Sequence, residues 1–297
     1  MSQLTKKELS ILIPNYNNVC VGLVEDLLRQ AEPLGIPFEI IVADDASTDN
    51  ETVKANQAIN ELPYCRYIIK EQNTGSAATR NFLAQQSQYQ WLLFLDADIL
   101  IPESDFIRRY LENDGQGVVN GGIRIVDNPI LENTLRYRYE RQAEPRHTAD
   151  LRQQNKYREF RSTNFLIARE AILRCAFDER FKHSGYEDVM FGKQLRQKAI
   201  PVVHISNPVL IEHFEDNSCF VGKTEQQLRT LHTFRDELRG YSRLITFAEG
   251  IHIPLVRSLI RIIHKLFGPL VRRMLCGGRP SVHLYTLYKL GYYLTLK

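Results

Sequence analysis

The first third of the chain alternates short apolar runs with segments whose apolar residues recur at every third or fourth position. The short runs are typical of strands and the longer segments of helices. Alternation of this kind is typical of a mostly parallel sheet with helices on both faces. Pro14 is expected to end the first strand. We predict strands at 9–13, 38–43, 64–69 and 91–95, and helices at 20–31, about 50–61 and 74–88.

The middle of the chain is less regular. Residues 128–161 are rich in Arg, Tyr, Glu and Gln and show only a faint period. Such a stretch can form a mobile loop, helices that line a site, or a solvent-exposed insert, and the pattern does not choose between them. Further strands are predicted at 162–168 and 202–205, and a further helix at 188–198.

Residues 253–274 have one broad apolar face when they are placed on a helix. Pro269 is expected to kink or interrupt this helix, because its ring removes a backbone hydrogen bond. Four basic residues fall together on the opposite face: Arg257, Arg261, Lys265 and Arg272.

Charge is unevenly distributed along the chain. Residues 251–297 contain eight Lys or Arg and no Asp or Glu; subtracting these eight charges from the net +3 leaves −5 for residues 1–250. A basic amphipathic helix can lie in the headgroup layer of an anionic membrane, and the lack of acidic residues favours this for residues 251–275. The alternative is a helix packed on the main domain with solvated basic residues. The chain has no uninterrupted apolar stretch long enough to span a bilayer.

Composition indicates an ordinary globular protein, with 43% hydrophobic and 25% charged residues. Five scattered cysteines without a CxxC pair argue against a disulfide framework and a zinc site, and favour reduced thiols. The first residues lack the apolar core of a signal peptide. We expect a cytoplasmic protein that can be peripheral to the inner face of the plasma membrane, with one main domain at 1–240 and a basic helical segment at 241–297.

The first candidate for chemistry is Asp96-Ala97-Asp98, directly after the apolar run 91–95. A strand buried on both faces would place these two carboxylates at the rim of the sheet, where open α/β sheets bind ligands. Carboxylate oxygens suit Mg²⁺ or Mn²⁺, which commonly bridge to substrate phosphates. Taken alone, the motif is more often a polar turn that ends a strand.

Two further motifs follow the first and second predicted strands. Ile13-Pro14-Asn15-Tyr16-Asn17 offers an aromatic ring that can stack on a base, and Asp44-Asp45-Ala46-Ser47-Thr48-Asp49 offers a carboxylate that can accept from a pyrimidine N–H. The second motif is also a good helix N-cap, and taken alone that is the more frequent role.

Two more motifs begin predicted helices. In the segment 73–81, small residues would let backbone amides approach an anion, and Arg80 adds a guanidinium for phosphate. In Gly185-Tyr186-Glu187-Asp188, a carboxylate can serve as a general base. The structural alternative is a carboxylate that caps its helix.

The order of these five motifs resembles glycosyltransferase family 2, over about residues 8–235. The resemblance implies a GT-A fold, with a nucleotide-binding half at about 8–120 and an acceptor half at about 121–240. It implies that Asp188 is the catalytic base, supported by Glu187. It also implies a donor site and a divalent metal, Mn²⁺ or Mg²⁺, with Asp98 and Asp96 holding the metal on the diphosphate. The donor-binding residues would be Pro14, Tyr16, Asp45, Arg80, Asp96 and Asp98.

The resemblance extends to one His beyond the base. His213 is the candidate for a third metal ligand, although a lone His is often structural. One departure from the family pattern is Ala46, where Gly is usual, so Ala46 must tolerate the turn. Arg138 and Glu140 are candidates for acceptor contact, but no motif assigns them.

The implied reaction is an inverting transfer from a nucleotide-diphosphate sugar, with a UDP-sugar favoured, to a hydroxyl acceptor. A basic tail suggests a lipid-linked or cell-envelope glycan as acceptor, and no nucleic-acid partner is expected. Three alternatives stay open: a nucleotidyltransferase that makes nucleotide sugars, a non-catalytic binding module, and a membrane-surface scaffold. The first would normally carry a Gly-rich basic loop after strand one, which Pro14-Asn15-Tyr16-Asn17 is not. The second would lack Asp98 or Asp188, and both are present.

Overall fold

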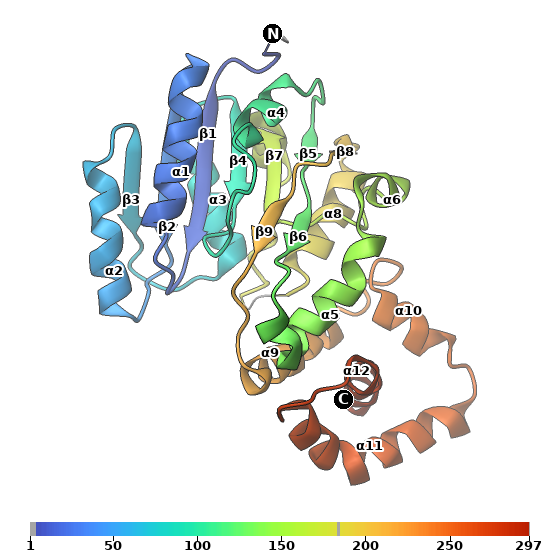
Figure 1. The fold of residues 1–297 in the computed structure, drawn as a ribbon. Coiled ribbons are helices and arrows are strands. Elements are labelled where there is room, and N and C mark those ends of the chain that lie inside the picture. The colour runs from blue at the N-terminus through green and yellow to red at the C-terminus, as the bar shows by residue number, and fades with distance from the viewer. Residues whose placement is uncertain (1–3, 183–184, 297) are drawn as a thin grey trace.

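The computed structural model describes residues 4–182 and 185–296. Within these residues, seven strands form a mixed sheet in the order β3-β2-β1-β4-β7-β5-β8, and β6 and β9 form a small second sheet (Figure 1). Neighbouring strands are parallel except where β7 runs antiparallel to β4 and β5. The strands are β1 Leu9–Asn15, β2 Phe38–Asp44, β3 Cys65–Ile69, β4 Trp91–Leu95, β5 Val118–Asn120, β6 Ile123–Ile125, β7 Asn164–Ala168, β8 Val202–His204 and β9 Val209–Ile211.

The predicted strands of the first third are confirmed. All residues of β2 and β4 are buried, because helices cover both faces of the sheet and leave an apolar core on each side. The expectation that Pro14 ends the first strand is wrong, since β1 continues to Asn15 in register with β2. Beyond Leu12, β1 has no pairing with β4, so the missing N–H of Pro14 interrupts no ladder on that side.

The predicted helices form with small shifts of their ends. The helix expected at about 50–61 is an α-helix to Asn56 and a 3₁₀-helix from Gln57 to Glu61. The helix expected at 74–88 begins only at Ser76, because Gly75 has a left-handed φ of 88°. The helices are α1 Val21–Ala31, α2 Asn50–Asn56, α3 Ser76–Gln86, α4 Phe106–Glu112, α5 Leu135–Ala143, α6 Ala149–Gln154, α7 Arg169–Arg174, α8 Glu187–Gln197, α9 Asn217–Thr233, α10 Arg243–Gly250, α11 Pro254–Leu275 and α12 Val282–Thr295.

The polar stretch 128–161 forms α5, α6 and short 3₁₀ turns. The buried guanidinium of Arg152 fastens α6 to the sheet. It donates to the carbonyls of Asn120 at 3.2 Å and Ile205 at 2.9 Å, and to the carbonyl of His147 at 3.1 Å. The helical alternative for this stretch is therefore the one observed.

The last helices lie at the end of the molecule away from the N-terminus, where α11 packs along α12 (Figure 1). The two helices come close together where Gly291 of α12 lies against His264 of α11. Pro269 does not interrupt α11, contrary to one of the two expectations for it. In the part of the chain that the structure describes, no helix is both long and apolar enough to cross a bilayer.

The apolar face of α11 points away from the rest of the protein. Its large apolar side chains are 39–77% exposed, whereas three of its basic residues turn inward. Arg257 donates to the Ala248 carbonyl at 2.8 Å, Arg261 to the Leu294 carbonyl at 2.7 Å, and Arg272 to Glu225 at 2.8 Å. The exposed apolar residues are Leu255, Val256, Leu259, Ile262, Ile263, Leu266, Phe267, Leu270 and Met274, with Ile253 beside them.

Candidate active site

A cavity of about 480 Å³ lies at the carboxyl ends of β1, β2 and β4, and we call it the rim cavity. This is the edge of the sheet at which the polar motifs were expected to meet. The fold therefore brings together eight of the nine predicted site residues, which line this one cavity: Pro14, Tyr16, Asp45, Arg80, Asp96, Asp98, Glu187 and Asp188.

The two carboxylates after β4 differ in their surroundings. Asp96 Oδ1 accepts from Arg80 Nη2 at 2.7 Å. Asp98 lines the same cavity, and its side chain is exposed. Although Asp98 is exposed overall, loss of solvent around its carboxyl, followed by repulsion from Asp96, raises its pKa. Two neighbouring carboxylates that repel each other, with carboxylate oxygens at the cavity, fit a divalent cation such as Mg²⁺ or Mn²⁺.

His213 lies apart from this carboxylate pair. Its side chain is 78% exposed and pairs with Glu212 at 3.3 Å, and it does not line the rim cavity. Among the residues described, no group of three or more His, Cys, Asp or Glu side chains is arranged to hold a metal ion. Asp96 and Asp98 are thus the predicted ligands that meet in the cavity.

Asp45 is buried and strongly hydrogen bonded. It accepts from the Lys70 ammonium at 2.6 Å, the Thr74 N–H at 3.0 Å and the Gly75 N–H at 2.8 Å. Burial alone would raise the pKa of Asp45, but these hydrogen bonds outweigh it and lower the pKa. Asp45 therefore fixes the loop that leads into α3, beside the half-exposed ring of Tyr16.

Two backbone positions in the neighbouring loops, Gly75 and Ala46, bear on the roles expected from the sequence. The Gly75 N–H is taken by Asp45, so it is not free for an anion; a Cβ at Gly75 would lie 2.4 Å from the Lys182 carbonyl oxygen. Ala46 has a left-handed φ of 56°, the conformation for which the family usually has Gly. Position 75 therefore requires Gly for packing and backbone conformation.

Arg80 links the two acidic motifs. It is buried, with Nη2 on Asp96 and Nη1 3.8 Å from Glu187 Oε1. Nε and Nη1 of this guanidinium have no hydrogen-bond partner in the described part of the chain. Glu187 in turn accepts from the Gly185 N–H at 2.8 Å. A buried guanidinium with unused donors at the rim cavity suits a ligand phosphate.

Asp188 lies in the first turn of α8, after a residue in a strained conformation. Tyr186 has a φ of 69°, which is uncommon for a bulky side chain and typical of functional sites. Asp188 Oδ1 accepts from the Val189 N–H at 2.7 Å, so one oxygen supports the helix as the structural alternative expects. Burial, followed by repulsion from Glu187, raises the pKa of Asp188 to about 6. A pKa near neutrality is what a general base needs.

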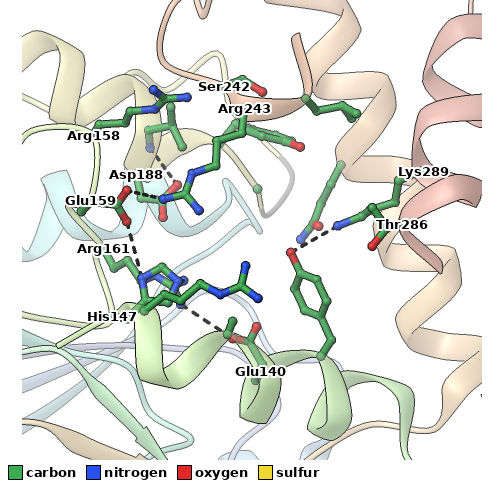
Figure 2. A pocket seen from close by; sticks show the side chains of 18 of the residues that line it. Glu140, His147, Arg158, Glu159, Arg161, Asp188, Ser242, Arg243, Thr286 and Lys289 are labelled. Atoms are coloured by element: carbon green, nitrogen blue, oxygen red, sulfur yellow. Dashed lines mark hydrogen bonds and ion pairs between the residues drawn. The ribbon is translucent and has the colours of Figure 1, made fainter. Parts of the chain in front are cut away.

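A second cavity, of about 570 Å³, is shown in Figure 2, and we call it the basic cavity. The same residues line both cavities at their junction, and Asp188 is one of them. A group at this junction can act on two ligands that occupy the two cavities side by side. The shared residues are Glu140, Arg161, Gly185, Asp188 and Gln227.

Several residues at these cavities were not assigned from the sequence. Glu140 was a candidate and lines both cavities, whereas Arg138 donates to the Pro280 carbonyl at 2.8 Å and lines neither. Arg136 lies four residues before Glu140 and also lines the rim cavity, so helical spacing on α5 could have indicated it. Lys289 comes from α12, and no local pattern connects it with the site.

Comparison with known proteins identifies relatives of this chain. A family model described as Glycosyl transferase family 2 matches residues 10–177. The chondroitin synthase of Escherichia coli is 25% identical over 227 residues, which are 65% of this chain and 33% of that protein. A putative teichuronic acid biosynthesis glycosyltransferase, TuaG of Bacillus subtilis, is 31% identical over 97 residues, which are 31% of this chain and 36% of that protein. The chain thus spans about a third of the length of these curated relatives.

A solved structure shares the fold. The mannosyltransferase PcManGT from Pyrobaculum calidifontis, in complex with GDP-Man and Mn²⁺, superposes with a TM-score of 0.59 at 14% identity. The match covers 96% of this chain and 84% of that one. At 14% identity, the similarity shows a shared arrangement of helices and strands.

Proposed function

Because this chain belongs to glycosyltransferase family 2, we propose that it transfers a sugar with inversion from a nucleotide-diphosphate sugar to a hydroxyl acceptor. The donor binds in the rim cavity and the acceptor in the basic cavity. The single observation that carries this proposal is the position of Asp188, which lines both cavities at their junction.

Asp188 is the general base of this reaction. Its carboxylate takes the proton of the acceptor hydroxyl as that oxygen attacks the anomeric carbon. The bond between the anomeric carbon and the diphosphate oxygen breaks in the same displacement, and the nucleotide diphosphate leaves with the electron pair. Burial is the main cause of the raised pKa of Asp188, and repulsion from Glu187 adds to it. Arg80 holds Asp96 and lies near Glu187.

The carboxylates of Asp98 and Asp96 fit a Mn²⁺ or Mg²⁺ ion, as their charge and their oxygens at the cavity indicate. Such an ion would neutralise charge on the departing diphosphate. PcManGT binds Mn²⁺ with its donor, which supports the same metal class here. In this proposal Pro14, Tyr16 and Asp45, which line the rim cavity, hold the base of the donor, favoured as uracil.

The test begins with a thermal-shift screen of UDP- and GDP-sugars with Mg²⁺ or Mn²⁺, since a bound donor stabilises only the folded state. Asp188→Asn keeps the shape of the side chain but cannot accept the proton. We expect this variant to bind the selected donor like the wild type and to lose turnover, measured as nucleotide-diphosphate release with a cell-envelope extract as acceptor. Asp26→Asn, at a surface ion pair away from both cavities, is the matched control. Wild-type turnover in Asp188→Asn would remove Asp188 from the mechanism.

The exposed apolar face of α11 fits an anionic membrane surface as a further partner. Nine large apolar side chains of one helix are exposed together, which exceeds the scattered exposure usual for surfaces. The segment 251–297 has only basic charges, so two copies of this face would repel each other while an anionic bilayer attracts it. A membrane-bound transferase suits a lipid-linked or cell-envelope glycan acceptor, and TuaG is a relative assigned to envelope polymer synthesis.

A further inference from the structure

The basic cavity and the rim cavity have opposite charge. Six carboxylates and three guanidinium groups line the rim cavity, whereas three carboxylates and five cationic side chains line the basic cavity. The rim cavity therefore favours a cation, and the basic cavity favours an anion. The cationic residues of the basic cavity are Arg146, Arg158, Arg161, Arg243 and Lys289.

Two of these five cations are neutralised by carboxylates of the same cavity. Arg243 lies 2.5 Å from Glu159, and Arg161 lies 3.8 Å from Glu140. Hydrogen bonding by His147, opposed by burial and reinforced by Arg243, lowers the pKa of Glu159 to about 2. Glu159 thus stays ionised and paired with Arg243 at neutral pH, and it does not neutralise the other cations of the cavity.

Arg158 and Lys289 are the cations that remain half-buried without a carboxylate partner within the residues described. Arg158 uses Nε for the Tyr241 carbonyl at 3.2 Å, which leaves its two terminal nitrogens unused. Lys289 donates to the Tyr139 hydroxyl at 3.2 Å and lies over that ring. Figure 2 shows the two residues on opposite walls of the cavity, with Asp188 on the side of Arg158. A half-buried cation without a carboxylate partner gains more binding free energy from an anionic ligand than a cation that is already paired.

We propose that the acceptor of this enzyme carries an oxyanion, a phosphate or a carboxylate, which Arg158 and Lys289 bind in the basic cavity. The oxyanion holds the acceptor while its hydroxyl reaches Asp188 at the junction with the rim cavity. This inference rests on the proposed function, because it takes the basic cavity as the acceptor site. It restricts the acceptor to anionic molecules, whichever sugar is transferred.

Three small probes test this proposal. They are methyl phosphate, methyl glucuronide, and methyl glucoside, which is methyl glucuronide without the carboxylate. Binding is measured by saturation-transfer NMR with UDP and Mg²⁺ present in excess, so that the rim cavity is occupied. We expect methyl phosphate, methyl glucuronide or both to bind, and methyl glucoside to bind at least about tenfold more weakly. The phosphate and glucuronide arms decide between the two sources of the oxyanion.

Variants locate the binding. Arg158→Gln and Lys289→Gln should each weaken the oxyanion probe about tenfold, and Arg158→Lys and Lys289→Arg should retain most of the binding. Arg108→Gln, on α4 and outside both cavities, is the matched control. The midpoint of thermal unfolding reports that each variant is folded, since Lys289 also lines a neighbouring cavity with Asp96 and Asp98. Equal binding of all three probes, no binding of either anion, or binding that is unchanged in both Gln variants would overturn the inference. Failure of both UDP and GDP to bind the wild type would instead contradict the proposed function.

Discussion

Asp188 makes the proposed reaction depend on pH through a single carboxyl group. The base must be ionised to accept a proton, and its pKa is raised to about 6. We therefore expect kcat/KM to be full above this value and to fall tenfold per pH unit below it. The pH profile of donor turnover, taken with the same acceptor extract throughout, measures this limb.

A variant of Glu187 tests whether the acidic limb of the pH profile belongs to Asp188. Glu187→Gln removes the negative charge but keeps an acceptor for the Gly185 N–H. Because repulsion from Glu187 contributes to the raised pKa of Asp188, the acidic limb should move to lower pH in this variant. A limb that stays in place would belong to another group.

The carboxylate pair after β4 predicts a second measurement. Asp98→Ala removes the carboxylate oxygens and the repulsion between Asp96 and Asp98. We expect the affinity for UDP with Mn²⁺ to fall at least about tenfold, and a chelator to have the same effect on the wild type. Calorimetric titration of UDP with and without metal measures both. Equal affinity with and without metal in the wild type would contradict the metal assignment.

The sequence could predict those site residues that are marked by a local pattern, but not those that reach the site through contacts between distant parts of the chain. Asp96, Asp98 and Asp188 each follow or begin a regular element, so an apolar run or a helix start indicates where they lie. His213 has no such marker and lies exposed, apart from the carboxylate pair. Lys289 belongs to the site only because α12 packs near α5, and no pattern within either helix encodes that contact.

At the scale of elements, the first four strands were predictable and the polar insert was not. β1 to β4 form where apolar runs are buried on both faces, which is a local property of the sequence. The insert that contains α6 is held by hydrogen bonds between residues far apart in the chain. Arg152 alone joins α6 to β5 and to the carbonyl after β8. A polar stretch of this kind has no apolar period from which to predict its position.

This role of Arg152 predicts a large loss of stability on substitution. Arg152→Met fills similar space but removes the donor to Asn120 Oδ1 and to the carbonyls of His147 and Ile205. We expect the free energy of unfolding to fall by at least about 3 kcal/mol, because each unsatisfied buried group costs about 1–3 kcal/mol. Urea denaturation measures the change. Arg174→Met, at a surface ion pair, should change stability by no more than about 0.5 kcal/mol.

At the scale of the whole molecule, α11 is placed where its apolar face cannot contribute to the core. The helix packs on α12 through a narrow side that includes Gly268 and Leu275, and its inward basic residues bond to neighbouring helices. The sequence predicted the amphipathic pattern, and the structure shows which face stays uncovered. A surface of this size exposed to water costs free energy that burial in a bilayer would recover.

This arrangement predicts binding to anionic vesicles through α11. We expect the full chain to co-sediment with phosphatidylglycerol vesicles, less with phosphatidylcholine vesicles, and less at high salt, since basic residues such as Lys265 and Arg273 add electrostatic attraction. Leu259→Glu and Leu266→Glu should each weaken binding at least about tenfold, because each removes a buried leucine from the bilayer and adds a repelled charge. Ile130→Glu, at an exposed apolar residue outside α11, is the matched control. If the two α11 variants instead bind vesicles as the wild type does, or if they convert a wild-type dimer to a monomer in sedimentation velocity, the face of α11 contacts something other than a membrane.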